Sequence, residues 1–162
     1  MPSTAPLQVT RIKQRACVQL KSWTTELDVR PLTLDGNGED IRILTYAPGE
    51  WLAVSDVLAG PMLKDHLDRE LSAQPLAAVD LSQALAPLRI EGVAARDVLA
   101  KSCGLNLEPR VFLAGTCART RLAQLSVVVH CTDPGPKYEL YAGRSYLNYL
   151  FAWLTDAAVE FE

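Results

Sequence analysis

The sequence predicts an α+β fold made of two small interleaved units with mixed or antiparallel sheets. Short apolar stretches are bounded by Gly, Pro and Asn turns, which is typical of strands. Three other segments carry apolar residues at helical spacing. The elements follow the order β-β-α-β in the first half and β-α-β-β-β-α in the second. This order predicts a strand-rich unit over residues 1–85 and a second unit over 86–162. The boundary is soft, because no flexible linker marks it and one compact domain is the alternative.

Composition indicates an ordinary globular protein. The chain has 162 residues, of which 49% are hydrophobic and 22% are charged. Its net charge of −3 argues against nucleic-acid binding, which needs a basic face. The N-terminus lacks an apolar signal-peptide core, and no apolar run approaches the ~20 residues that cross a bilayer. We therefore expect a cytoplasmic protein with no membrane partner, whose four scattered cysteines are free thiols.

Strands and a hairpin are predicted in the first half. Residues 41–47 (IRILTYA) alternate in side-chain character, and EWLAVS at 50–55 follows a Pro-Gly turn as the partner strand. A helix is expected to begin at Pro61. Proline has no backbone N–H, but the N–H groups of the first helical turn have no partner within the helix, so its absence costs little there. Leu63, Leu67 and Leu71 then fall on one face. Further strands are predicted over 18–23, around 31–34 and over 76–82, with a turn at 35–40.

Two helices are predicted in the second half. The helix predicted over 93–103 ends at Gly104, and the helix predicted over 144–161 is the longest in the chain. Strands are expected over 87–92, 117–125, 126–131 and 138–143.

Motifs for nucleotide or thiol chemistry are weak. Gly92 is the only glycine at the start of the helix predicted over 93–103, without the Gly-rich loop that dinucleotide and phosphate sites need. Close packing of the strand against this helix explains the glycine better than a nucleotide site. Cys103 lies at the end of the same helix, where the partial negative charge disfavours a thiolate. We expect a buried structural cysteine there.

Metal and acid–base sites are also poorly supported. Cys117, His130 and Cys131 could suggest zinc, but neighbours on a strand point to opposite faces. His66 is expected to form an ordinary surface pair with Glu70, four residues further along the helix. Acidic pairs lie in polar surface contexts, and no G-x-S-x-G motif is present. From its residues, the chain offers no catalytic, cofactor or metal site.

The final helix is more apolar than packing on one sheet requires. Its core line runs through Leu147, Leu150, Leu154, Ala158 and Phe161. Tyr146, Trp153 and Ala157 widen the apolar arc on one side, Phe151 widens it on the other, and Tyr149 lies at the margin. Aromatic side chains at the margin of a helix face are common in interfaces. We therefore predict a subunit interface that includes Tyr146, Tyr149, Phe151 and Trp153; the alternative is that loops of the same chain cover this edge.

The gamma subunit of heterotetrameric sarcosine oxidase is the family that the chain resembles. The resemblance rests on LAKSCGLNLEP, GTCARTRLAQL and RSYLNYLFAWL, in this order, within the stretches 88–130 and 138–161. GEWLAVS at 49–55 is similar to the family's first-half hairpin. The match covers about half of the chain strongly and most of the rest weakly.

The resemblance implies a fold related to the folate-binding aminomethyltransferase (T-protein) of glycine cleavage. It also implies a place beside alpha, beta and delta subunits, chiefly against alpha. That complex demethylates sarcosine with oxygen, giving glycine, hydrogen peroxide and formaldehyde, or methylenetetrahydrofolate when tetrahydrofolate is present. FAD, FMN, NAD, tetrahydrofolate and zinc are implied on the other subunits. No catalytic residue is implied for this chain.

Two other functions stay open. A related complex could act on another N-methyl or secondary amino acid. A free-standing folate-dependent carrier enzyme is the alternative from a different class, although T-protein relatives need roughly twice this length to enclose the pterin.

Overall fold

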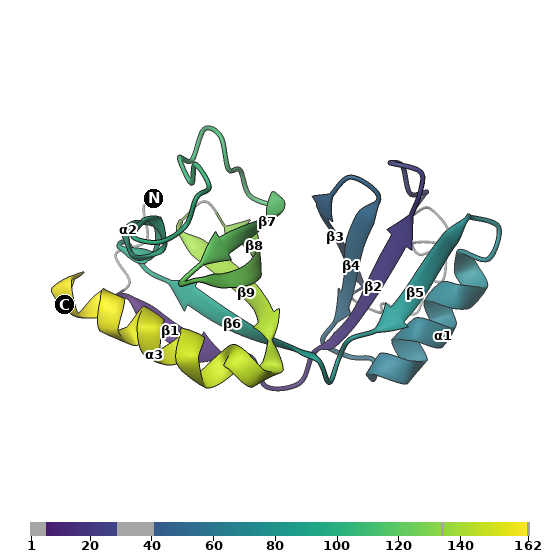
Figure 1. Ribbon diagram of the computed structural model, residues 1–162, viewed down its shortest axis with the longest axis horizontal. Coiled ribbons are helices and arrows are strands. Elements are labelled where there is room, and N and C mark those ends of the chain that lie inside the picture. The colour runs from purple at the N-terminus through teal and green to yellow at the C-terminus, as the bar shows by residue number, and fades with distance from the viewer. Residues whose placement is uncertain (1–5, 29–40, 134, 162) are drawn as a thin grey trace. The chain divides into compact units, whose positions relative to one another are not determined.

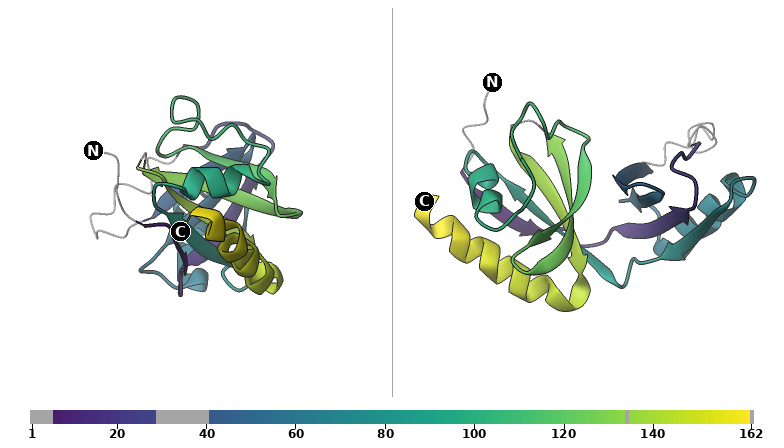
Figure 2. Two further views of the ribbon diagram at one scale, coloured as in Figure 1. Left: turned by 90° about the vertical axis from the view of Figure 1, so that its left-hand side faces the viewer. Right: turned by 45° about the horizontal axis from the view of Figure 1, so that its top comes forward.

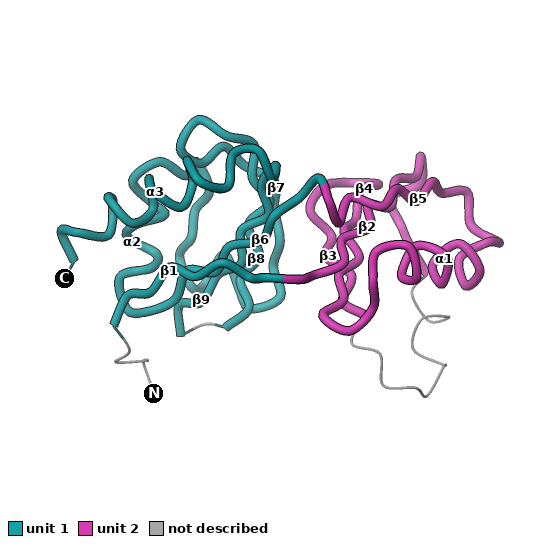
Figure 3. Tube along the Cα trace, turned by 90° about the horizontal axis from the view of Figure 1, so that it is seen from below, with its two compact units in different colours: residues 1–13, 84–162 teal, residues 14–83 magenta. Residues whose placement is uncertain are grey.

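The computed structural model describes residues 6–28, 41–133 and 135–161 and divides the chain into two compact units. Unit 1 consists of Met1–Lys13 and Ala84–Glu162, and unit 2 is the segment Gln14–Gln83 between them (Figure 3). The strands are β1 (Gln8–Arg11), β2 (Ala16–Ser22), β3 (Arg42–Ala47), β4 (Glu50–Ser55), β5 (Leu76–Asp80), β6 (Leu85–Glu91), β7 (Cys117–Leu122), β8 (Leu125–Asp133) and β9 (Lys137–Gly143). The helices are α1 (Gly60–Glu70), α2 (Ala95–Ala100) and α3 (Leu147–Ala158), and α3 is flanked by the 3-10 turns η2 (Arg144–Tyr146) and η3 (Val159–Phe161).

The division differs in one respect from the expected units 1–85 and 86–162. Residues up to Lys13 belong with the C-terminal segment, because β1 pairs antiparallel with β6, from Gln8 opposite Glu91 to Arg11 opposite Leu88. The boundary after Gln83 lies close to the expected position. Unit 1 is therefore built from both ends of the chain.

Unit 2 contains, within its described residues, a four-stranded antiparallel sheet in the order β3-β4-β2-β5. The predicted hairpin is confirmed, since β3 pairs with β4 across a turn at Gly49. The predicted strand around 31–34 and the turn at 35–40 lie outside the described residues. Helix α1 covers one face of the sheet against β5 and β2 (Figure 1). The core between them consists of Ala16, Val18, Leu20, Trp51, Ala53, Leu63, Leu67 and Leu71.

Helix α1 begins where the proline predicts. No side chain caps its first turn, but the carboxylate of Asp80 and the hydroxyl of Ser82 lie beside Gly60. A Cβ at Gly60 would stand 2.4 Å from Ser82 Oγ and 2.6 Å from Asp80 Oδ2. A carboxylate near a helix N-terminus is favourable, because it faces the positive end of the helix dipole. Glycine leaves room for it.

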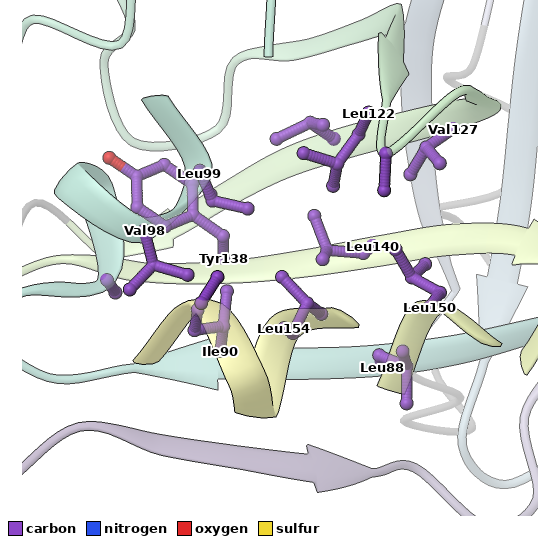
Figure 4. Packing of buried hydrophobic residues seen from close by; sticks show 14 of the residues in the cluster. Leu88, Ile90, Val98, Leu99, Leu122, Val127, Tyr138, Leu140, Leu150 and Leu154 are labelled. Atoms are coloured by element: carbon purple, nitrogen blue, oxygen red, sulfur yellow. The ribbon is translucent and has the colours of Figure 1, made fainter. Parts of the chain in front are cut away.

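Unit 1 contains, within its described residues, a five-stranded antiparallel sheet in the order β1-β6-β9-β8-β7. Helix α3 runs along β1 and β6, and α2 packs beside it (Figure 2). Side chains from four strands meet those of both helices in one buried cluster (Figure 4). The residues labelled there are Leu88, Ile90, Val98, Leu99, Leu122, Val127, Tyr138, Leu140, Leu150 and Leu154.

Three boundaries differ from the sequence prediction. The helix expected over 93–103 spans only Ala95–Ala100, and the last helix becomes 3-10 from Val159. The turn between β7 and β8 falls at Ala123 and Gln124 rather than near residue 125. That turn carries neither Gly nor Asn, which explains why turn chemistry could not locate it. No helix in the described ranges is long and apolar enough to cross a bilayer.

Candidate functional site

Gly92 follows β6, where a phosphate loop would have to begin. Its φ is +122°, a conformation that side-chain-bearing residues rarely adopt. A Cβ there would lie 2.7 Å from Leu7 Cα and 2.7 Å from Pro6 O. The space above Gly92 is thus filled by the backbone that leads into β1. The glycine serves close backbone packing, as its isolation in the sequence suggested, although the neighbour is the N-terminal segment rather than α2.

The cysteines are free thiols, of which Cys103 and Cys131 pack in or against the unit 1 core and Cys117 is partly buried. Cys103 is partly buried and packs against the unit 1 core, just beyond α2. Burial raises the pKa of the Cys117 thiol to about 12. Burial also raises the pKa of Cys131, whose Sγ lies 3.6 Å from the carbonyl oxygen of Asp133. Neutral thiols are weak nucleophiles, because the thiolate is the reactive form.

The three possible zinc ligands do not all converge. Cys117 on β7 and His130 on β8 lie opposite each other in register, but Cys131 does not join them. Cys131 lies in the unit 1 core opposite Tyr138, whereas His130 is paired in register with Glu139 and lies outside that core cluster. Adjacent strand residues point to opposite faces, so these two side chains cannot share one ion. Among residues 6–28, 41–133 and 135–161, no three His, Cys, Asp or Glu side chains are placed to hold a metal.

The expectation for His66 was wrong. Rather than pairing with Glu70 on the surface, His66 is only 8% exposed and joins Leu63 and Leu67 on the buried side of α1. Helical spacing explains the error, because position 66 follows Leu63 by three residues and therefore shares its face. The exposed ion pair on this helix is instead Lys64 with Asp68, at 2.5 Å.

A buried polar cluster on the five-stranded sheet is the feature that sequence reasoning missed. Glu139 on β9 is 1% exposed and accepts hydrogen bonds from Arg89 Nη2 on β6 and from the Tyr141 hydroxyl, each at 3.0 Å. His130 Nδ1 on β8 lies 3.8 Å from Glu139 Oε2. Tyr141 follows Glu139 by two residues on β9, whereas Arg89 and His130 reach Glu139 only through strand register. The alternation of Tyr138 and Leu140 with Glu139 does indicate two sheet faces.

The Glu139 cluster resembles a structural ion pair more than an acid–base centre. Both carboxylate oxygens already accept hydrogen bonds from the chain's own donors. A catalytic carboxylate needs a position from which it can reach a substrate proton. The hydrogen bond from Arg89 to Glu139 instead ties β6 to β9, whereas His130 Nδ1 on β8 lies nearby at 3.8 Å without hydrogen bonding to Glu139.

The predicted interface residues lie on α3 and, for Tyr146, on the η2 turn that precedes it, and the structure separates them into two pairs. Tyr146 and Tyr149 are about half exposed, one turn apart on the same side of the helix. Trp153 is partly buried against the unit 1 core. Phe151 also packs there, and the guanidinium of Arg11 on β1 lies 4.8 Å from the centre of its ring. Phe151 and Trp153 therefore pack against other parts of the same chain. For these two residues, this packing favours the alternative that the chain itself covers this edge of the helix.

The sequence matches the model of the sarcosine oxidase, gamma subunit family over residues 14–160. The chain belongs to that family. Sarcosine oxidase subunit gamma of Corynebacterium sp. (strain U-96) is 32% identical over 126 residues, which are 78% of this chain and 60% of the relative. The subunit of an Arthrobacter species is 32% identical over the same share of this chain and 61% of its own length. The match to these curated gamma subunits thus spans about three-fifths of their length.

Two solved structures resemble this chain in fold. A chain of heterotetrameric sarcosine oxidase from Corynebacterium sp. U-96, in complex with pyrrole 2-carboxylate, matches with a TM-score of 0.81 and 25% identity, covering 96% of this chain and 85% of that one. Aminomethyltransferase T of the glycine cleavage system from Bartonella henselae matches with a TM-score of 0.66 at 12% identity, over 93% of this chain and 45% of that one. The second likeness concerns the fold alone and confirms the expected aminomethyltransferase-like architecture.

Proposed function

We propose that this chain is the non-catalytic gamma subunit of a heterotetrameric sarcosine oxidase. The family match over residues 14–160 carries the proposal, and the likeness to a chain of a heterotetrameric enzyme supports it. Alpha, beta and delta subunits would be its partners, chiefly alpha, within the cytoplasm. The assembled enzyme would oxidise sarcosine with oxygen to glycine, formaldehyde and hydrogen peroxide, or form methylenetetrahydrofolate in the presence of tetrahydrofolate.

The residue geometry supports a subunit that breaks no bonds. The space above Gly92 is occupied by backbone, and the Cys117 and Cys131 thiols are kept neutral by burial. Glu139 is engaged by Arg89 and Tyr141. These residues do not suit a flavin, a pterin or zinc, so we propose that FAD, FMN, NAD, tetrahydrofolate and zinc are all held by the other subunits.

The subunit's contribution would be its surface. Tyr146 and Tyr149 expose aromatic rings on one side of α3, which is anchored beneath them by Leu150 and Leu154. Tyrosine suits such a position because its ring can be buried while its hydroxyl keeps a hydrogen-bond partner. Permanent subunit interfaces typically bury more than about 2,000 Å², so these two rings would form part of a wider contact.

Co-expression of the four subunits tests the docking role of α3. With a tag on alpha, Tyr149→Glu should lower the recovery of this chain at least about tenfold, because a carboxylate would be buried without a partner. Thr155→Glu is the matched control, since Thr155 is exposed on another side of α3. Equal recovery of both variants and the wild type would show that this side of α3 is not part of the interface.

The likeness to aminomethyltransferase T favours one rival, a free-standing folate-dependent carrier. That function predicts tight binding of tetrahydrofolate by the purified chain, measured by calorimetric titration. The proposed gamma subunit predicts no such binding, together with co-purification of the flavin-carrying subunits. A complex acting on another N-methyl or secondary amino acid would assemble in the same way and would differ only in its preferred substrate.

A further inference from the structure

Trp23, at the end of β2, is the most exposed large apolar side chain among the described residues. It is 92% exposed, whereas Trp51 is 3% exposed within the unit 2 core. The remaining tryptophan, Trp153, is packed against the unit 1 core. Single exposed apolar residues are common, but aromatic side chains bury 150–250 Å² each and contribute strongly to the interfaces in which they occur. An almost fully exposed indole on a fixed backbone is therefore a candidate interface anchor.

The turn that presents Trp23 is held on both sides. The Ser22 amide donates a hydrogen bond to Gly49 O at 2.9 Å, and the Ser22 hydroxyl donates to Pro75 O at 2.7 Å. The Thr24 amide donates to Ser22 Oγ at 3.1 Å. The residues on either side of Trp23 are thus tied to the β3–β4 turn and to the segment before β5. A side chain held on a fixed backbone loses less entropy when it binds.

Gly49 lies in close backbone contact with this turn. A Cβ at Gly49 would lie 2.5 Å from Ser22 O and 3.2 Å from Thr24 O, and its φ is +70°. The β3–β4 turn can therefore approach the Trp23 turn closely only because residue 49 is glycine. This close backbone contact positions Trp23 without covering its side chain.

Charge indicates the chemistry of the partner. Unit 2, residues 14–83, contains six Lys and Arg residues against eleven Asp and Glu residues, a net charge of −5. Glu26 is exposed in the segment that follows Trp23. A partner surface that carries Lys or Arg would complement this acidic unit. A guanidinium or ammonium group can also lie against the indole face as a cation–π contact.

We propose that Trp23 is a docking anchor that enters an apolar pocket, rimmed by Lys or Arg, on another subunit of the assembly. The inference rests on the proposed function, because it requires a heterologous partner. It adds a second contact, on unit 2, to the one proposed on α3. Anchors of this kind often carry a large share of the binding energy of an interface.

Capture by the tagged alpha subunit in the co-expressed complex tests the anchor. Trp23→Ala should weaken assembly at least about 30-fold, the loss typical of a tryptophan hot spot. Val57→Ala, at a residue 70% exposed in the same unit, is the matched control and should leave assembly unchanged. The thermal midpoint of the variant chain should equal that of the wild type, because Trp23 makes little contact with its own unit. Unaltered assembly of Trp23→Ala would overturn the inference.

Photo-crosslinking identifies the occupant. With p-benzoylphenylalanine in place of Trp23 in the co-expressed complex, mass spectrometry should find crosslinks to a peptide of another subunit that contains Lys or Arg. The same probe in place of Val57 should give few such crosslinks. Crosslinks only to a second copy of this chain, or only within the chain, would contradict a heterologous pocket. If the wild-type chain fails to assemble at all, the proposed function fails; if it assembles and Trp23→Ala assembles equally well, the anchor alone fails.

Discussion

At Gly92, the backbone of the segment after β6 lies in close contact with the backbone of residues 6 and 7. Residues 6 and 7 occupy the space of a Cβ, and the φ of +122° places the backbone where L-residues are strained. The same close approach brings β1 against β6 and thereby joins the N-terminus to unit 1. The backbone contact beside the β1–β6 pair therefore requires glycine at position 92.

Gly92→Ala should reduce the free energy of unfolding by about 2 kcal/mol or more, since it combines backbone strain with a backbone clash. Urea denaturation of the purified chain measures this change. Gly104→Ala provides the control, because the nearest atom to its added Cβ would be Thr120 Oγ1 at 3.9 Å. A loss at Gly92 no larger than at Gly104 would show that residues 6–7 do not pack there.

Cys117 gives a prediction about pH. Burial raises its pKa from 9.0 to about 12, so the folded state holds a proton that the unfolded state releases first. The resulting stabilisation is complete below about pH 9 and is lost as the pH rises towards 12. At pH 8, Cys117 in the folded chain should be alkylated roughly a thousandfold more slowly than in the urea-unfolded chain, in line with the thiolate fraction. Mass spectrometry of iodoacetamide-treated chain measures both rates, and similar rates in the two states would contradict a buried neutral thiol.

At the scale of single elements, the β7–β8 hairpin is unusual because neither turn residue is glycine or asparagine. Ala123 has φ +49° and Gln124 has φ +69°. Positive φ at both positions suits the twist of a two-residue hairpin, but it is strained for residues with a Cβ. The turn is fixed by a hydrogen bond from the Ala123 amide to Ser102 Oγ, at 2.9 Å, beyond α2.

Gln124→Gly should therefore raise the free energy of unfolding by about 0.5–1 kcal/mol, because glycine adopts this backbone conformation without strain. Gln124→Ala is the appropriate control: it removes the exposed hydrogen bond with Arg121 but keeps the strained Cβ. Thermal or urea unfolding distinguishes them. A loss of stability in both variants would mean that the side-chain contact outweighs the backbone strain.

Lys101 holds the C-terminal end of α3. Its ammonium donates a hydrogen bond to Ala157 O at 2.6 Å, pairs with Glu160 at 2.8 Å and lies 5.0 Å from the centre of the Phe161 ring. Cations near helix C-termini are favourable because they face the negative end of the dipole. Lys101→Met should cost about 1 kcal/mol and speed amide exchange over residues 157–161, whereas Lys101→Arg should cost less. Unchanged amide exchange over residues 157–161 in Lys101→Met would show that Lys101 does not hold the end of α3 in place.

The sequence predicted the elements that bury a regular stripe and missed those defined by long-range pairing. Leu63, Leu67 and Leu71 located α1, because helical spacing alone identifies a buried face. Strand β1 could not be found in this way, since QVTR is short and mostly exposed and becomes a strand only by pairing with β6. The Glu139 cluster was missed for the same reason, because Arg89 and His130 reach Glu139 only through register.

For the whole molecule, the two units differ in charge and in exposed aromatic residues. Unit 2 has a net charge of −5, whereas residues 1–13 and 84–162 contain ten Lys and Arg residues against eight Asp and Glu residues. Unit 1 exposes Tyr146 and Tyr149, and unit 2 exposes Trp23. Sequence periodicity predicted the aromatic margin of α3, but it could not distinguish the exposed tyrosines from Phe151 and Trp153, which pack within the chain.

The proposed role as a non-catalytic subunit can be tested by affinity purification of this chain, expressed once alone and once with the other three subunits. The visible absorbance of the eluate is measured. We expect a flavin spectrum and stoichiometric partner subunits from the co-expression, and a colourless chain without sarcosine oxidase activity when it is expressed alone. Flavin absorbance or sarcosine turnover by the lone chain, or the absence of any flavoprotein from the co-expressed sample, would contradict this role.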